Sequence, residues 1–109
     1  MMRRLLVGDE LTRQLVRLPH WACDGFSLTA RFDFPTFLDL IGAVGDIALV
    51  AEELDHHPDL DIRWRTLRVA LTTHSAGGLT QLDVESAHRV NECARGFGGT
   101  AQQPPPAPR

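Results

Sequence analysis

The amino-acid sequence predicts an α+β fold, a two-layer sandwich in which three helices cover one face of a four-stranded antiparallel sheet. Three segments carry apolar residues at the three- and four-residue spacing of a helix. Between them, apolar and polar residues alternate, as in strands with one buried face. The resulting order is helix, two strands, helix, two strands, helix, and a chain of 109 residues is long enough for one such domain.

The first helix is expected to begin at Asp9, a candidate N-cap, and to end before Pro19. Its apolar residues recur at helical spacing and are Leu11, Leu15 and Leu18. The turn dipeptide Asp24-Gly25 then separates the segment 21–23 from a longer strand, and the two should pair as a hairpin. The apolar residues that alternate along this strand are Phe26, Leu28, Ala30, Phe32 and Phe34.

The longest helix is expected to follow Pro35, which suits a first helical turn, and to run down to a pair of histidines. Its expected buried stripe consists of Phe37, Ile41, Val44, Ala48 and Ala51. Gly42 and Gly45 each weaken a helix interior relative to alanine. We therefore expect the helix backbone to lie close against the sheet or a partner at these two positions.

The second pair of strands follows Pro58. Ile62 and Trp64 share one side-chain parity, whereas the later apolar residues Leu67, Val69 and Leu71 share the other. A turn or bulge near Arg65–Thr66 is needed to bring both sets to one face, which predicts two strands or one sharply bent strand.

The last helix opens with Thr80 as N-cap and Asp83 three residues on, the pattern of a capping box. Leu79 and Val84 are placed for a hydrophobic staple across this helix start. The buried stripe of the helix is expected to contain Ala87, Val90, Ala94 and Phe97.

These elements form a single domain over residues 9–96. Residues 1–8 are expected to be a flexible N-terminus, and the Gly- and Pro-rich residues 97–109 a disordered tail, because neither offers a core-forming pattern. No apolar run is long enough for a membrane span or a signal peptide. Cys23 and Cys93 fit neither a metal-ligand spacing nor a disulfide framework, so we expect small buried thiols in a cytoplasmic protein.

The charge pattern argues against direct nucleic-acid binding. The net charge is -3 and the isoelectric point is about 5.9, so the chain lacks the basic surface that phosphate backbones require. We interpret the local basic cluster of Arg63, Arg65 and Arg68 as a solvated strand face.

Chemistry-bearing residues concentrate at Glu52–Asp59 and at His74. Imidazole is costly to bury unless its nitrogens are satisfied, and Pro58 ends the preceding helix, so His56 and His57 are expected to face one cleft. Glu52 lies one helical turn before His56 and is expected to orient it. The simpler alternative is an exposed helix C-terminus, where cationic histidines are favoured by the helix dipole.

A metal site is a competing interpretation, with His56, His57 and His74 joined by Glu52 or Asp83. Zinc sites use histidines and carboxylates, but the chain lacks the His-Glu-x-x-His spacing that places two ligands on one helix face. We therefore expect no metal.

From Leu11 to about Ala94 the sequence resembles the pterin-4a-carbinolamine dehydratase family. The family's active-site pattern falls, with its spacing intact, on Glu52, His56, His57, Pro58, Trp64, His74 and Asp83. Leu60 departs from the pattern of many relatives, which carry an aromatic residue there, and this difference bears on pocket shape. Without the resemblance, Asp83 would be interpreted as a capping residue, Trp64 as a core aromatic and His74 as a surface histidine.

The resemblance implies dehydration of a 4a-hydroxytetrahydropterin to a quinonoid dihydropterin in tetrahydrobiopterin recycling, without cofactor or metal. Both steps are proton transfers, which imidazoles perform near neutrality because they ordinarily titrate at about pH 6.5. We expect His56 and His74 to be the acid–base pair and His57 to position the pterin, with Glu52 and Asp83 completing the catalytic set. Expected substrate contacts are Pro58, Trp64, Asp55, Thr73 and Ser75.

The same resemblance permits a non-catalytic alternative, because the family includes dimerisation cofactors and assembly factors. It also implies a homodimer or homotetramer, which agrees with the need to cover the edge strands of an open sheet.

Overall fold

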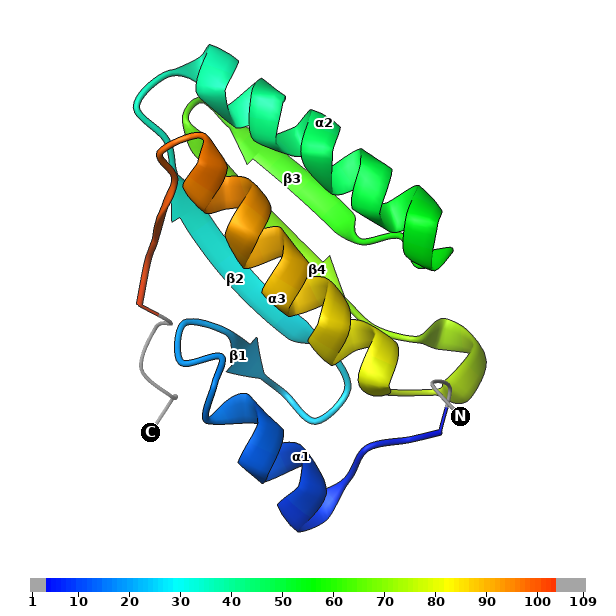
Figure 1. Cartoon of the computed structure of the whole chain (residues 1–109). Helices are drawn as coiled ribbons and strands as arrows, with labels where there is room; N and C mark the ends of the chain where they lie inside the picture. Colours follow the sequence, from blue (N-terminus) through cyan, green and yellow to red (C-terminus); the bar gives the residue numbers. More distant parts are fainter. Residues whose placement is uncertain (1–3, 104–109) are drawn as a thin grey trace.

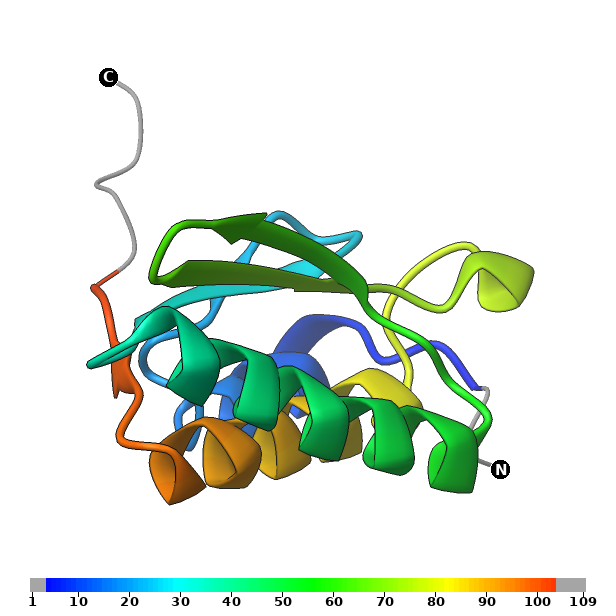
Figure 2. The ribbon, with the colours of Figure 1, turned by 90° about the horizontal axis from the view of Figure 1, so that it is seen from above.

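The computed structural model of the chain describes residues 4–103. Three helices lie on one face of an antiparallel sheet and leave the other face open (Figures 1 and 2). The predicted α+β class is therefore confirmed. In chain order the elements are α1 (Gly8–Leu15), β1 (Ala22–Cys23), β2 (Leu28–Asp33), α2 (Phe37–Leu54), β3 (Asp59–Arg63), β4 (Thr66–Leu71), the 3-10 helix η1 (His74–Ala76), α3 (Gln81–Gly96) and β5 (Thr100–Ala101).

The sheet has the strand order β1-β2-β4-β3, and every pairing is antiparallel. β1 and β2 form the predicted hairpin. The two residues Trp64 and Arg65 separate β3 from β4, so the change of side-chain parity does mark a turn between two strands. A fifth strand, β5, was not predicted and pairs with the end of β2. β3 lies at one edge of the sheet (Figure 1).

The core lies between the sheet and the helices. Alternate residues of the two central strands are buried there: Leu28, Ala30, Phe32, Leu67, Val69 and Leu71. Trp21 is also buried, lies edge-on to Phe32 and donates its indole N–H to Asn91 on α3 at 2.9 Å. Because this polar tip is satisfied, the ring can pack in the core without an unpaired donor.

The predicted stripe of α2 is wrong for most of its residues. The buried residues are Leu40, Ala43, Ile47 and Ala51, whereas Phe37, Ile41 and Ala48 are exposed. The helix is apolar around most of its circumference, so its spacing alone permits two stripes, and only packing against α3 and the sheet selects one. The N-cap is Thr36, whose hydroxyl accepts from the amide of Asp39, so Pro35 precedes the helix instead of opening it.

Gly42 and Gly45 of α2 differ in what lies next to their backbone. A β-carbon added at Gly42 would lie 2.3 Å from the ring of Phe97, so the predicted close approach is confirmed there, with an aromatic ring as the neighbour. At Gly45 an added β-carbon would meet no atom within 4 Å. Gly45 therefore faces open space in this chain.

Part of each end that was expected to be flexible packs against the domain. Leu6 is buried in the core and donates its amide to Leu79 at 2.8 Å, because the apolar residues before α1 reach the start of α3. α1 begins at Gly8, with Asp9 in its first turn rather than at its N-cap. At the other end, the β5 pairing and a hydrogen bond from the backbone amide of Gln102 to the carbonyl of Arg31, at 2.8 Å, hold the chain against β2. The remainder of both predicted ends, residues 1–3 and 104–109, lies outside the described residues.

The last helix agrees with its prediction in detail. Thr80 caps it, the capping box with Asp83 is formed, and Ala87, Val90 and Ala94 are buried. Phe97 lies just past the helix and packs against the core.

Two smaller predictions are wrong. Cys23 is exposed, since it lies next to the hairpin turn, whereas Cys93 is half-buried; both thiols are free. Phe26 is also exposed, because the turn around Asp24 includes it and β2 begins only at Leu28. Among the described helices, none combines the length and apolar character needed to span a bilayer.

Candidate active site

A buried polar network joins the end of α2 to the start of α3. The ring Nε2 of His56 lies 2.6 Å from Oδ1 of Asp83, and the two side chains are 7% and 0% exposed. The other oxygen of Asp83 accepts from the hydroxyl of Thr73 at 2.7 Å and from the amide of Thr80 at 2.9 Å. The two threonine hydroxyls are themselves 2.8 Å apart. Asp83 thus has three donors, which is what a buried carboxylate requires.

The backbone around Asp55 explains why His56 turns inward. Asp55, the C-cap that follows α2, is in the left-handed conformation with φ of 50°, and the amide of His56 donates to the carbonyl of Ala51 at 3.0 Å. Pro58 follows directly and prevents the helix from continuing. The chain therefore reverses over two residues, which buries His56 and leaves its neighbour His57 outside.

His57 lies in different surroundings. Its Nε2 is 2.7 Å from Oε2 of Glu52, and the two side chains are 59% and 77% exposed. The expectation that Glu52 orients His56 is therefore wrong, because the one-turn spacing applies only while the helix continues. The expectation that both rings face one cleft stays a prediction: the two rings differ in burial and in partner, yet belong to adjacent residues.

The loop after β4 carries the third histidine. Thr73 and Gly78 form an isolated bridge, and between them His74 begins η1 with its side chain exposed. Ser75 is also exposed on this short helix. Thr73, expected to contact substrate, is instead buried against Asp83. The C-terminal end of α2, η1 and the start of α3 lie at the same end of the molecule (Figures 1 and 2).

Trp64 is not brought to this cluster within one chain. Its ring is 75% exposed at the β3–β4 turn, its φ is 54°, and the Arg65 guanidinium lies 4.4 Å from the ring centroid. The five residues of β3 separate it from Pro58, six residue steps or roughly 20 Å at the usual strand rise. Pro58, half-buried, and Asp55, exposed, do lie at the histidine end.

The network contains one residue whose role the sequence prediction missed. Thr80 was assigned only as a helix cap, yet its amide and hydroxyl both belong to the hydrogen-bonded set around Asp83. The signal was present, because a capping box places its acidic residue against the N-cap by construction. What the sequence did not reveal was that His56 approaches the same carboxylate. Within residues 4–103, no three His, Cys, Asp or Glu side chains gather closely enough to hold a metal ion.

Comparison with known proteins links this arrangement to a family. The model of the family described as pterin 4 alpha carbinolamine dehydratase matches residues 4–93. A protein of Mycolicibacterium smegmatis with the provisional name pterin-4-alpha-carbinolamine dehydratase is 49% identical over 87 residues, covering 80% of this chain and 93% of its own. A protein of Nocardia farcinica with the same provisional name is 40% identical over 95 residues, 87% of this chain and all of its own.

Solved structures agree with this assignment. A protein from Brucella melitensis, described as a transcriptional coactivator/pterin dehydratase, superposes with a TM-score of 0.77 at 36% identity, covering 82% of this chain and 97% of its own. A pterin dehydratase-like RuBisCO assembly factor of the alpha-carboxysome gives a TM-score of 0.57 at 20% identity, covering 68% of this chain and 86% of its own. The second likeness shows the fold alone.

Proposed function

The chain belongs to the pterin-4a-carbinolamine dehydratase family, and we propose that it dehydrates a 4a-hydroxytetrahydropterin to the quinonoid dihydropterin by histidine acid–base catalysis. In this reaction the bond between ring carbon 4a and its hydroxyl breaks, and the neighbouring ring nitrogen loses its proton. A carbon–nitrogen double bond forms and water leaves. Tetrahydrobiopterin recycling in the cytoplasm, where the free thiols of Cys23 and Cys93 stay reduced, is the setting we propose.

The observation that carries the proposal is the buried pair of His56 and Asp83. A carboxylate that only accepts hydrogen bonds holds a hydrogen on the Nε2 of His56, which leaves Nδ1 as the nitrogen that can exchange a proton. Fixing an imidazole in one tautomer and stabilising its protonated form is how a buried carboxylate assists a histidine acid or base. Asp83 is then a positioning residue for His56.

The other two histidines complete the proposed machinery. His74 is the second acid–base group, exposed on η1 next to Thr73, which anchors the network. His57 positions the pterin, and Glu52, at 2.7 Å, fixes the orientation of its ring. Pro58 supplies part of the apolar wall for the flat pterin ring, while Asp55 and Ser75 remain proposed polar contacts.

Turnover of purified protein tests the proposal. His56→Ala and His74→Ala should each lower the rate of carbinolamine disappearance by about 100-fold to 10,000-fold, the contribution of one general acid or base. His88→Ala, a histidine on α3 outside the network, is the matched control and should keep the wild-type rate. Wild-type turnover in either active-site variant would overturn its catalytic role. Absence of turnover in the wild-type protein would favour the alternative, a non-catalytic binding or assembly protein.

We also propose a homo-oligomer with a dimer as its minimum unit. β3 is an edge strand, and Leu60 and Ile62 on it are partly exposed. Antiparallel pairing of β3 with its copy about a two-fold axis brings the end of one strand beside the start of the other. Trp64 of one copy would then lie near Pro58 of the other, which supplies the aromatic that one chain does not bring to its own histidines.

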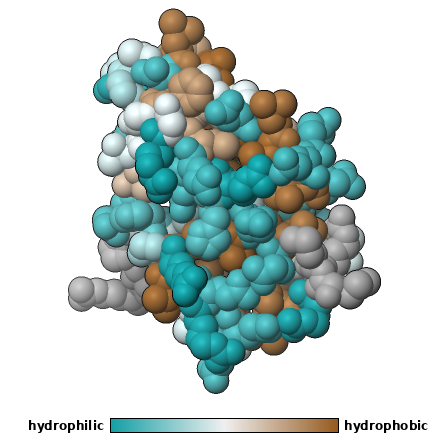
Figure 3. All heavy atoms as spheres, viewed as in Figure 1, coloured by the Kyte–Doolittle hydropathy of each residue, from teal (hydrophilic) through white to brown (hydrophobic). Residues whose placement is uncertain are grey.

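A second surface could join two such dimers. Apolar residues gather over α2 on the face seen in Figure 3, where Leu38 is 80% and Leu49 71% exposed. A second copy offers the same exposed leucines, so pairing the two copies removes these side chains from water. Light scattering at micromolar concentration should give at least twice the 12.1 kDa monomer mass, and a mass near the monomer would overturn the proposal. The double variant Leu38→Glu/Leu49→Glu should reduce a tetramer to a dimer.

A further inference from the structure

Two arginines lie opposite each other on the face of the sheet that no helix covers. Arg31 on β2 and Arg68 on β4 are register partners and both are exposed. Like charges directly opposite on neighbouring strands repel and destabilise a sheet. Neither guanidinium makes a hydrogen bond or ion pair with another described residue. The pair therefore has no evident role in stabilising the fold.

Two of the three carboxylates on the same face make their hydrogen bonds elsewhere, and the third, Asp59, lies diagonal to Arg68 on β3 without a hydrogen bond to it. Asp33 accepts hydrogen bonds from the hydroxyl of Thr66 at 2.7 Å and from the side-chain amide of Gln102. Asp61, which faces Arg68 across β3 and β4, lies 3.4 Å from Nε of Arg63 instead. Arg31 acts on Asp33 only through its charge, so no carboxylate occupies the N–H donors of either guanidinium, and these donors are open to an anion from outside the chain.

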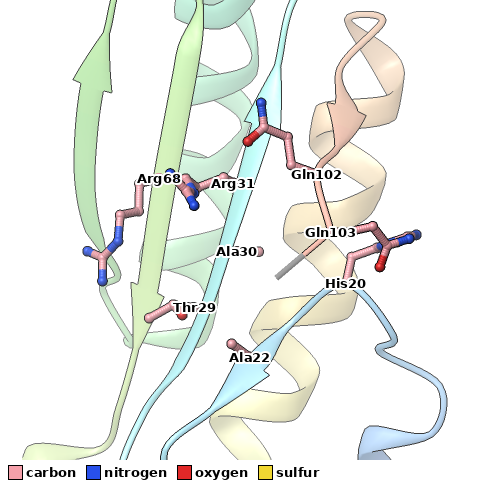
Figure 4. A pocket seen from close by; sticks show the side chains of 8 residues that line it. All are labelled: His20, Ala22, Thr29, Ala30, Arg31, Arg68, Gln102 and Gln103. Carbon is pink, nitrogen blue, oxygen red and sulfur yellow. The ribbon is translucent and has the colours of Figure 1, made fainter. Parts of the chain in front are cut away.

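The arginines border a hollow of about 310 Å³ over β2. Figure 4 shows Arg31 and Arg68 on its β4 side, and His20, Gln102 and Gln103 on the side of β5. The ring Nδ1 of His20 is buried and has no hydrogen-bond partner. The same two arginines also line an adjoining hollow of about 340 Å³. Both volumes are at the lower end of those that hold small organic ligands.

We propose that this hollow is a second ligand site, which binds a phosphate or phosphate-monoester group between Arg31 and Arg68. Guanidinium groups match phosphate oxygens with paired N–H donors, and exposed arginine side chains can turn toward a bound ion. The hydroxyl of Thr29 and the amide of Gln103 line the same hollow and offer further donors.

A small anion suits the site better than a nucleic acid does. Asp33 lies two residues along β2 from Arg31, Asp61 lies opposite Arg68 on β3, and the chain carries a net charge of -3. A continuous phosphate backbone would meet these carboxylates, whereas a single phosphate group would not.

Nuclear magnetic resonance titration of the ¹⁵N-labelled full chain, at fixed ionic strength, tests the site with inorganic phosphate and with glycerol 3-phosphate. We expect saturable shifts centred on the backbone of residues 29–31 and 68–70. Arg31→Gln and Arg68→Gln should each weaken binding by about tenfold, as the loss of one charged hydrogen bond implies. Arg17→Gln, which changes an exposed arginine beyond α1, should leave binding unchanged.

The outcomes separate the two sources of the anion. Tighter binding of the ester identifies a phosphorylated metabolite, and equal or weaker binding identifies the free ion; both support the site. The proposal is overturned if neither probe saturates, if the arginine variants bind as the wild type does, or if the shifts centre on His56, His57 and His74. Melting temperatures at or above the wild-type value would show that the variants remain folded, because each substitution relieves a repulsion.

Discussion

Replacing Asp83 with alanine should destabilise the protein more than any substitution of an exposed acidic residue. Asp83 accepts from His56 at 2.6 Å, Thr73 at 2.7 Å and the Thr80 amide at 2.9 Å, all buried. After the substitution, the hydroxyl of Thr73 can donate to that of Thr80, 2.8 Å away. The two donors that lose their partner are therefore Nε2 of His56 and the amide of Thr80. Each stranded buried donor costs about 1–3 kcal/mol, which agrees with the ~3–5 kcal/mol for breaking a buried ion pair.

Urea unfolding followed by tryptophan fluorescence measures this cost, because Trp21 is buried and becomes exposed on unfolding. A loss of ~3–5 kcal/mol should lower the melting temperature by 12 °C or more, given ~4–8 °C per kcal/mol for a domain near 100 residues. Asp59→Ala, at an exposed position, is the control and should change the free energy of unfolding by less than ~0.5 kcal/mol.

A double-mutant cycle isolates the His56–Asp83 contact. We expect the two alanine substitutions to be coupled by about 0.5–3 kcal/mol, since each removes the partner of the other. Asp83→Asn, which keeps the shape, should fold more stably than Asp83→Ala yet lose about 100-fold or more in dehydration rate. If Asp83→Ala unfolds at the wild-type urea concentration, the buried network does not exist in solution and the mechanism built on it is wrong.

Two further predictions concern packing and thiol reactivity. Gly42→Ala should lower the free energy of unfolding by ~1–3 kcal/mol, because the added methyl group collides with the Phe97 ring. Gly45→Ala, at a position that faces open space, should raise it by up to ~1 kcal/mol. Equal effects of the two substitutions in urea unfolding would contradict this packing. Burial raises the pKa of the Cys93 thiol, so less of it is thiolate at a given pH, and Cys23 should be alkylated first by iodoacetamide. Peptide mass spectrometry that finds equal rates would count against this difference.

The parts of the fold that the sequence predicts well are those specified by local chemistry. The capping box of Thr80 and Asp83 requires only residues three apart, and the structure forms it. The hairpin turn at Asp24 is equally local, since its carboxylate accepts from the amides of Phe26 and Ser27. These hydrogen bonds also lower the pKa of Asp24, with that from Ser27 the largest cause.

The parts that the sequence did not predict depend on packing between distant segments. α2 is apolar on more than one side, so the spacing could not show that Leu40 and Ile47, rather than Phe37 and Ile41, face the core. β5 has only two residues and no pattern of its own, and it forms because β2 presents an open edge beside the end of α3.

The sequence indicated that carboxylates are the partners of His56 and His57, but it did not show which carboxylate lies beside which ring. Glu52 and His56 are one helical turn apart, and the spacing would have paired them had α2 continued. The left-handed turn at Asp55 shifts every later side chain, so Glu52 contacts His57 while His56 reaches Asp83 on another helix. A spacing rule of this kind therefore fails at a helix end, which is also where the candidate site lies.

β4 connects the two proposed sites while keeping their side chains apart. Leu67, Val69 and Leu71 point into the core, and the strand leads directly to Thr73 in the buried network. Arg68 has the opposite parity and faces the open side of the sheet. Truncating its side chain therefore removes no core contact and no hydrogen bond to the network. Loss of phosphate binding in Arg68→Gln would not disturb the histidine site, so either proposal can fail without the other.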